Sequence, residues 1–295
     1  MCLATLFPLA VAAMGEKSLL NNGGDSSDPR TFVPNNELPP AVRPETGDTG
    51  EPSALASGLN ESDAIRTVAF SPDEEFNSDF GNMTSCGDGM CRCNATYADC
   101  SKHGANLTYV PQLPPGVTFL NFTYNRAHIN HDDFFRNVTG IDHLEIGDNE
   151  IRWISPGAFK TLPKLKILDL GRNNLTYTTL APVLSVKTLT KLNVIEMSLG
   201  NVPDDLFHDY PLLQLEILLM YGNKMRKLNL SVFAPLRNLR KLVLGSNKIS
   251  EIETTYLPNL RYLSLDDCGI PFFPETCGEN SSASLFPRLE TLYLK

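Results

Sequence analysis

Four cysteines, Cys86, Cys91, Cys93 and Cys100, lie within the fifteen residues "CGDGMCRCNATYADC". Thiols this close together can bind a zinc ion or form two disulfides. A zinc site would need a second cysteine pair or a histidine pair at ligand spacing, and only His103 lies nearby. Four cysteines allow three pairings, and their spacing alone does not choose among them.

The sequons favour disulfides over zinc, because they indicate an oxidising compartment. Nine Asn-x-Ser/Thr sequons occur in the chain, against about three expected by chance. They lie at Asn60, Asn82, Asn94, Asn106, Asn121, Asn137, Asn174, Asn229 and Asn280. This density is typical of a secreted glycoprotein, in which neighbouring thiols form disulfides.

The first part of the chain divides into a short apolar run and a polar stretch. Residues 3–14, "LATLFPLAVAAM", have the length of the apolar core of a secretory signal and are too short to span a bilayer. We therefore expect a signal peptide at 1–15, although the usual preceding positive charge is missing. Residues 16–85 are rich in Pro, Gly, Ser, Asp and Glu and show no periodicity, so we expect a disordered spacer there.

The net charge limits the classes of partner. The chain has 34 acidic and 25 basic residues, a formal net charge of −9. Binding to nucleic acid or to an anionic membrane surface needs clustered Lys and Arg, which this chain lacks. We therefore do not expect a nucleic-acid partner.

A repeat begins at Val117. Units that carry an apolar residue at positions 1, 4, 6 and 11 start at Val117, Ile141, Leu165, Leu189, Leu215, Leu239 and Leu260, and a shorter one with the first three of these positions starts at Leu289. The spacings between these starts are 24, 24, 24, 26, 24, 21 and 29 residues. Such a period predicts a solenoid, in which each unit buries its apolar side chains against its neighbours.

The repeated pattern, L-x-x-L-x-L-x-x-N-x-L, resembles the leucine-rich-repeat family. Position 9 is Asn at Asn125, Asn149, Asn173, Asn223 and Asn247, whereas Met197 and Cys268 interrupt this series. The resemblance implies an α/β-type solenoid: a horseshoe with a parallel concave sheet and an irregular convex side. About seven repeats and a truncated eighth would span 117–295.

The first repeat needs a cap, because its end face would otherwise expose apolar side chains. The cysteine stretch precedes Val117, and its spacing is similar to the N-terminal cysteine cap of extracellular leucine-rich-repeat proteins. We therefore assign 86–116 to this cap. The resemblance implies that Cys86 pairs with Cys93 and Cys91 with Cys100.

Residues typical of catalysis or metal binding form no convincing site. His128, His131, Asp132 and Asp133 resemble a metal-binding fragment, but the repeat register places them on the outer side without a third ligand in phase. No nucleophile elbow, zinc-protease motif or phosphate-binding glycine loop occurs. We predict a binding surface rather than an enzyme, with no cofactor and no metal.

Positions 3, 5 and 7 of each unit should face outward on the concave sheet. Across three units they form an apolar and aromatic patch with a charged edge, a composition that favours protein or ligand contacts. We predict that a partner contacts Leu219, Tyr221, Lys241, Val243, Tyr262 and Asp266. A sugar on Asn121 would project from the N-terminal end of the same face, so we expect binding to avoid that end.

The cap, the stretch "LTYVPQLPPGVTFLNFTYN" and the Phe at position 19 of several units resemble the start of a Toll-like receptor ectodomain. The resemblance covers 86–295 and implies recognition of a protein or a pathogen-derived ligand in innate immunity. The alternative is a secreted adhesion, matrix or guidance module. In either case we expect the chain outside the cell, as a secreted protein or as the extracellular part of a single-pass membrane protein. Since the last unit stops without a cap, we also expect a longer product.

Overall fold

The computed structural model describes residues 82–104, 107–270, 273–274, 276–277 and 283–294. The predicted signal peptide at 1–15 lies outside the described residues, as does the predicted spacer up to residue 81. The sequons at Asn60, Asn106 and Asn280 lie outside them too. The predictions for these segments therefore stay predictions.

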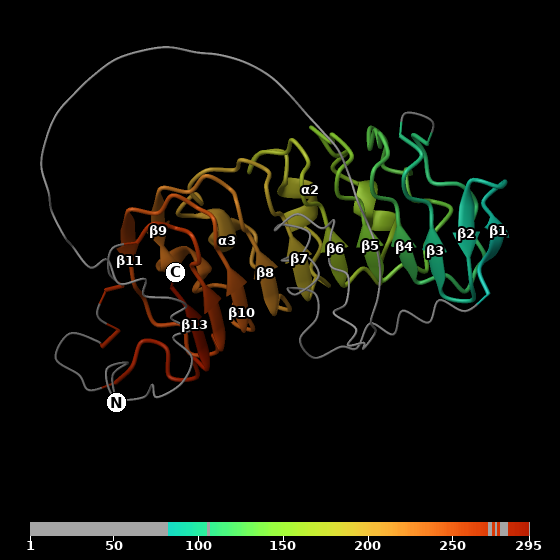
Figure 1. Cartoon of the computed structure of the whole chain (residues 1–295). Coiled ribbons are helices and arrows are strands. Elements are labelled where there is room, and N and C mark those ends of the chain that lie inside the picture. The colour runs from blue at the N-terminus through green and yellow to red at the C-terminus, as the bar shows by residue number, and fades with distance from the viewer. Residues whose placement is uncertain (1–81, 105–106, 271–272, 275, 278–282, 295) are drawn as a thin grey trace, which may run out of the picture. The chain divides into compact units, whose positions relative to one another are not determined.

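One sheet runs through all the units (Figure 1). Its eleven described strands are β1 (Thr84–Cys86), β2 (Cys91–Cys93), β3 (Tyr97–Asp99), β4 (Phe119–Asn121), β5 (His143–Glu145), β6 (Ile167–Asp169), β7 (Lys191–Asn193), β8 (Ile217–Leu219), β10 (Lys241–Val243), β12 (Tyr262–Ser264) and β13 (Thr291–Tyr293). From β3 to β13 each strand pairs in parallel with the next, position for position. This confirms the predicted parallel sheet and solenoid.

The core follows the repeat pattern. At position 4 of the seven units from Val117 to Leu260, the described leucines are at most 2% exposed: Leu120, Leu144, Leu168, Leu192, Leu218, Leu242 and Leu263. Position 6 is buried to the same extent in these units, for example at Phe122 and Ile146. Because side chains alternate along a strand, this register turns positions 3, 5 and 7 to the concave face.

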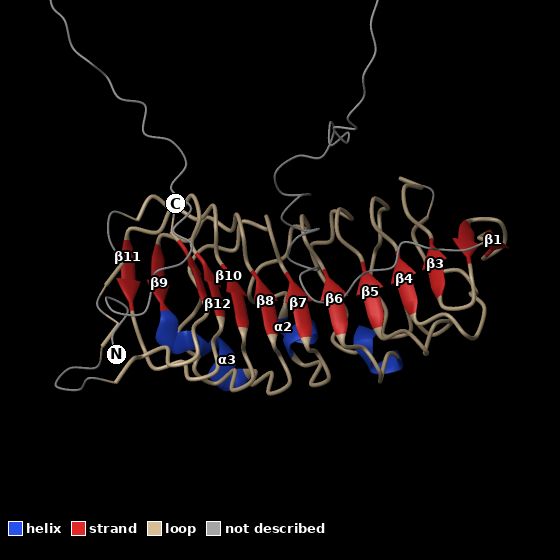
Figure 2. Ribbon diagram, turned by 60° about the horizontal axis from the view of Figure 1, so that its bottom comes forward, coloured by secondary structure: helices blue, strands red, loops and turns tan. Residues whose placement is uncertain are grey.

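Short helices form the side opposite the sheet (Figure 2). They are η2 (Ala158–Thr161), α2 (Ala181–Leu184), α3 (Leu206–Asp209) and η3 (Leu230–Phe233). Position 19 lies in each of them and packs inward. The ring centroids of Phe135 and Phe159 are 5.7 Å apart, and those of Phe207 and Phe233 are 5.8 Å apart. In the part of the chain that the structure describes, no helix is long and apolar enough to cross a bilayer.

The asparagines at position 9 form a buried ladder. Asn173 is 1% exposed, and its Oδ1 accepts hydrogen bonds from the N–H groups of Asn149 and Ile151 at 3.1 and 2.9 Å. Its Nδ2 donates to the carbonyls of Ile146 and Leu170 at 2.9 and 2.8 Å. One side chain therefore satisfies four backbone groups in two units. Buried backbone groups need such partners, because leaving them unpaired costs free energy.

Two residues interrupt the ladder, as the sequence indicates. The side chain of Met197 has neither a hydrogen-bond donor nor an amide oxygen to accept hydrogen bonds. Cys268 is a free, buried thiol whose Sγ donates to the Leu244 carbonyl at 3.3 Å. Burial raises the pKa of this thiol to about 11, so it stays protonated at neutral pH. Cys268 therefore partly replaces an asparagine, whereas Met197 does not.

Two disulfides close the N-terminal end, and they are the predicted ones: Cys86 with Cys93, and Cys91 with Cys100. Strands β1, β2 and β3 pair antiparallel, and β3 then pairs in parallel with β4. The cap thus continues the sheet of the repeats, and three of its cysteines are at most 3% exposed. Strand β1 begins at Thr84, just before the first residue assigned to the cap.

A second, smaller sheet lies apart from the main row of strands (Figure 1). It consists of β9 (Lys227–Asn229) and β11 (Glu251–Glu253), which pair in parallel. Both strands occupy positions 13–15 of consecutive units, beyond the turn that follows the concave strand. The repeat pattern does not predict this sheet.

Candidate binding surface on the concave sheet

Position 3 carries a row of packed side chains across the concave face. The rings of Tyr97 and Phe119 meet edge to face with centroids 4.7 Å apart, and His143 stacks on Phe119 at 3.8 Å. Towards the other end, Lys241 Nζ lies 4.7 Å from the centre of the Tyr262 ring. These contacts fix the rings against one another, so the row presents edges and side-chain tips rather than ring faces.

Several polar side chains at position 5 bond to their own strand. In Asn121, Asp169 and Asn193, Oδ1 accepts a hydrogen bond from the N–H two residues further on, at 2.8 to 3.1 Å. This local bond, common for Asn and Asp, fixes the direction of each side chain. Asp169 and Asn193 also lie opposite each other in register on β6 and β7. Position 5 therefore carries oriented polar side chains in the N-terminal half of the concave face.

Position 8 forms a rim where each strand ends, and four of its seven residues are charged. Its residues in the seven units from Val117 to Leu260 all take left-handed backbone conformations, with φ between 51° and 66°: Tyr124, Asp148, Arg172, Glu196, Gly222, Ser246 and Asp267. Only Gly222 adopts this conformation without steric cost. The turn after the strand therefore requires the conformation, and a single glycine among seven residues could not reveal this from sequence.

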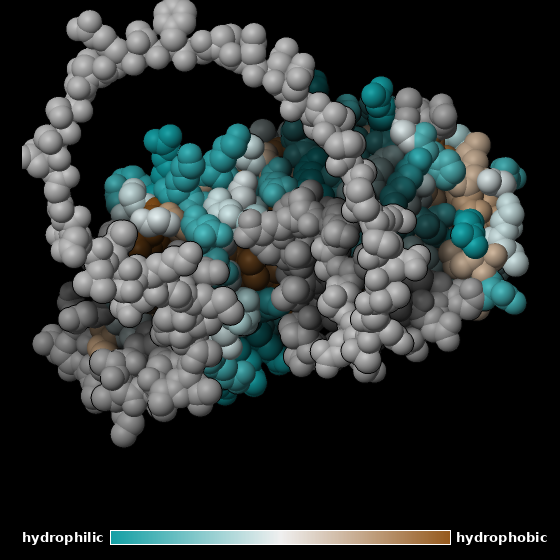
Figure 3. Space-filling model, viewed as in Figure 1, coloured by the Kyte–Doolittle hydropathy of each residue, from teal (hydrophilic) through white to brown (hydrophobic). Residues whose placement is uncertain are grey.

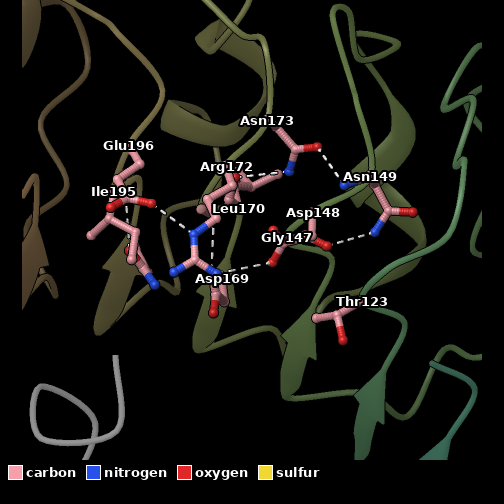
Figure 4. A network of polar contacts seen from close by, with 12 residues as sticks. Thr123, Gly147, Asp148, Asn149, Asp169, Leu170, Arg172, Asn173, Ile195 and Glu196 are labelled. Carbon is pink, nitrogen blue, oxygen red and sulfur yellow. Dashed lines mark hydrogen bonds and ion pairs between the residues drawn. The ribbon is translucent and has the colours of Figure 1, made fainter. Parts of the chain in front are cut away.

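Arg172 joins three units at this rim (Figure 4). Its Nε donates to Glu196 Oε2 at 2.7 Å, and its Nη1 lies 3.7 Å from Asp148 Oδ2. The Arg172 side chain is 16% exposed, so solvent screens these ion pairs less than it would at the surface. The rim thus carries a fixed acid–base–acid series next to the concave sheet.

The six predicted partner-binding residues come from three adjacent strands and the turns after them. Leu219 and Val243 lie opposite each other in register on β8 and β10, and Lys241 lies opposite Tyr262. The structure thus places them together on the predicted face.

Four of these six side chains have little exposed area: Leu219, Tyr221, Lys241 and Val243 are 2 to 7% exposed. Neighbouring side chains account for part of this burial. The Tyr221 ring lies over Gly245, where a Cβ would come within 3.1 Å of it, and Lys241 extends over Tyr262. The apolar centre is therefore enclosed, and the half-buried Tyr262 and Asp266 offer the accessible edge. In Figure 3 hydrophilic side chains predominate on the visible described surface and hydrophobic ones form small patches.

Tyr262 and Asp266 have defined surroundings. Burial raises the pKa of Tyr262 to about 12, so its hydroxyl stays protonated at physiological pH. Ser264 Oγ donates to Asp266 Oδ2 at 2.6 Å, which orients the carboxylate. Together they offer an aromatic ring, a hydroxyl and a carboxylate at the edge of the patch.

The described sequons lie in different surroundings. Asn82, Asn137 and Asn174 are exposed, and Asn94 and Asn229 are partly exposed. Asn121 lies at the end of β4 on the concave face, as predicted, and its Nδ2 is 3.5 Å from the Tyr97 hydroxyl. None of the described sequons lies on the strands β8, β10 and β12.

The histidine and aspartate fragment lies on the outer side, and its four residues are exposed. Within the described ranges, no group of three or more His, Cys, Asp or Glu could hold a metal ion. Asp132 instead joins two units: its Oδ1 accepts from the Ser155 hydroxyl and from the Gly157 N–H. The hydrogen bond from Ser155 contributes most to lowering the pKa of the Asp132 carboxyl, and the hydrogen bond from Gly157 lowers it further. The sequence gives no signal for this structural role.

Comparison with known proteins agrees with this geometry. A family model described as leucine rich repeat matches residues 115–175. Human epiphycan is 29% identical over 210 residues, which is 68% of this chain and 61% of that protein. Bovine lumican is 27% identical over 206 residues, 68% of this chain and 57% of that protein. The chain thus spans less than two thirds of the length of either relative.

Among solved structures, the "TLR13-ssRNA13 complex" overlays with a TM-score of 0.47 and 26% identity, covering 54% of this chain and 23% of that one. The fold itself rests on the strand register, the buried leucines and the asparagine ladder, together with the family match. The described part of the chain has the fold of a leucine-rich-repeat solenoid, and a cap with two disulfides closes its N-terminal end.

Proposed function

We propose that this chain is a binding module that acts outside the cell and contacts a protein or pathogen-derived ligand through the concave surface of β8, β10 and β12. The observation that carries the proposal is the Leu219–Val243 pair, in register and enclosed, beside Lys241 stacked on Tyr262. In protein interfaces, accessible aromatic side chains with charged neighbours are enriched among the residues that dominate the binding energy, and the enclosed Leu219–Val243 pair forms the rigid base on which Tyr262 is held. Asp266 adds an oriented carboxylate at the edge.

The extracellular location has two independent supports. Two disulfides form in the cap, and disulfides persist in oxidising compartments. The relatives that align over 68% of this chain are secreted or extracellular matrix proteins. The disulfides and the relatives are both compatible with a secreted protein and with a domain on the outer side of a membrane.

Two finer roles fit this module. A Toll-like receptor ectodomain for innate immune recognition is favoured by the cysteine cap and by the Phe residues packed at position 19. A matrix, adhesion or guidance role is favoured by the alignments with epiphycan and lumican. The full-length transcript separates them: a membrane span followed by a cytoplasmic signalling domain supports the receptor, and a C-terminal cap followed by a stop codon supports the matrix role.

The binding proposal can be tested without knowing the partner. The protein, fused to an antibody constant region, is applied to an array of purified secreted and cell-surface ectodomains. The variant Tyr262→Ala with Asp266→Lys should bind its hits about tenfold more weakly or worse, because it removes the accessible edge of the patch. A matched control is Trp153→Ala with Glu150→Lys, which changes one exposed aromatic and one exposed acid away from the concave strands.

The control should bind like the wild type, and Asn121→Gln should bind as well or better, since it removes a sugar only from the N-terminal end. The proposal fails if no hit depends on the Tyr262 and Asp266 variant. It also fails if the control variant loses binding to the same extent. A thermal unfolding curve for each variant ensures that weaker binding does not reflect unfolding.

A further inference from the structure

A groove of about 440 Å³ lies beside the small β9–β11 sheet. The residues that line it include Val202, Pro203, Asp204, Lys227, Asn229 and Glu251. It lies off the concave strands, at positions 13–15 of consecutive units. The concave binding surface does not use it.

The groove exists because the small sheet stops at β9. The equivalent positions of the preceding unit are Asn201, Val202 and Pro203, and Pro203 has no N–H to donate to a sheet. In place of a backbone carbonyl, the Asn201 Oδ1 accepts from the N–H groups of Arg226 and Lys227 at 2.8 and 3.1 Å. A third strand therefore does not form, and the edge of β9 stays open towards the groove.

Asn229, the last residue of β9, lines this groove and begins the sequon Asn229-Leu230-Ser231. Its Oδ1 accepts from the Ser231 N–H at 3.0 Å and from the Ser231 hydroxyl at 2.6 Å. The carbonyl oxygen is thus fixed to the start of η3. The remaining polar atom of the side chain is Nδ2, the atom to which an N-linked sugar is attached.

We propose that Asn229 carries an N-linked oligosaccharide whose first sugar residues lie in this groove, along the open edge of β9. The proposal rests on the extracellular location argued above. The lining suits a sugar. The Asp204 carboxylate can accept from sugar hydroxyl groups, and so can the second oxygen of Glu251, whose Oε2 is paired with Lys227 Nζ at 2.6 Å; Val202 with Pro203 offers an apolar wall for the C–H face of the ring.

Tethering makes weak contacts sufficient. A sugar attached to Asn229 meets the groove at an effective concentration in the millimolar range or above, because the bond to Nδ2 holds it there. The acidic lining residues do not form a cation site, since no metal-binding group of three occurs among the described residues. The sugar also covers a strand edge, which unprotected would be a site for unwanted strand pairing.

Site-resolved enzymatic release tests the proposal. The protein is secreted from mammalian cells and treated, in native form, with peptide-N-glycosidase in heavy-oxygen water, and mass spectrometry then follows the labelled aspartate at each sequon. Release at Asn229 should be about tenfold slower than at the exposed Asn137 and Asn174, a factor that corresponds to about 1.4 kcal/mol. After denaturation the three rates should agree.

A variant of the groove tests whether the groove causes the slow release at Asn229. Asp204→Arg places a long side chain in the groove and leaves the sequon intact, so release at Asn229 should speed up to the rate at Asn174. The proposal is overturned if Asn229 is unmodified while Asn137 and Asn174 carry sugar, if the native rates agree, or if the slow rate persists after denaturation or in Asp204→Arg. The proposal is also overturned if none of the three sites carries sugar in the secreted protein, and the binding proposal for the concave surface is then still decided by its own array experiment.

Discussion

Asn247 shows how much one side chain of the ladder contributes. It is fully buried, accepts from two N–H groups of the preceding unit at 2.9 and 3.0 Å, and donates to two carbonyls at 3.1 and 2.7 Å. The change Asn247→Ala leaves these backbone groups buried and unpaired, so it should lower the free energy of unfolding by about 2–4 kcal/mol. Denaturant titration of the wild type and the variant measures this loss of unfolding free energy. The exposed Asn238→Ala serves as control and should cost about 0.5 kcal/mol; equal losses would contradict the ladder's role.

At the residue scale, the sequence predicts what repeats and misses what occurs once. The ladder asparagines recur at fixed spacing, and the cap cysteines match a known spacing, so both could be assigned before the structure. Asp132 could not, because an exposed acid in a loop looks like a solvated one until its contacts with Ser155 and Gly157 are seen. The left-handed residues at position 8 share no residue type and were missed for the same reason.

The cap is the element on which the N-terminal end of the solenoid depends. The Cys91–Cys100 disulfide joins β2 to the end of β3, and β3 pairs directly with β4 of the first repeat. Cys91→Ser should therefore lower the free energy of unfolding by about 2–5 kcal/mol and reduce secretion. Thermal unfolding and the secreted yield measure the effect.

A suitable control is Cys268→Ala, which removes a cysteine but no disulfide and should cost about 1 kcal/mol. Non-reducing peptide mapping of the wild-type protein should find Cys86 with Cys93 and Cys91 with Cys100. Free thiols at all four cap positions in secreted protein would contradict both the pairing and the location.

At the element scale, prediction succeeded for strands that carry the period and failed for those that do not. Each concave strand contains a leucine at position 4 between two variable residues, in phase with its neighbours, and this phase fixes which face is buried. The strands β9 and β11 contain one apolar residue each, which a loop could equally contain. Their sheet depends on pairing between units, and the groove depends on Pro203, so neither is visible in a single unit.

At the scale of the whole described solenoid, the register predicts direction but not exposure. The sequence places Leu219 and Val243 on the concave face correctly, because side chains alternate along a strand. How far neighbours cover them depends on side chains from adjacent units, such as Lys241 over Tyr262 and Tyr221 over Gly245. A surface of this kind can therefore be located from the sequence, whereas its accessible edge cannot.

We expect the gap in the ladder at Met197 to divide the solenoid into two cooperative units. Met197 has no side-chain amide, so the boundary between the units that start at Leu165 and Leu189 lacks the hydrogen bonds that an asparagine makes at other boundaries. The pairing of β6 with β7 and the Arg172–Glu196 ion pair still join the two units. Stability in such chains is close to a sum of nearest-neighbour couplings, so the weakest coupling sets where partial opening stops. Native-state hydrogen exchange should thus give one opening free energy from the cap to Leu184 and a different one from Leu192 onward. Met197→Asn should merge the two into a single transition.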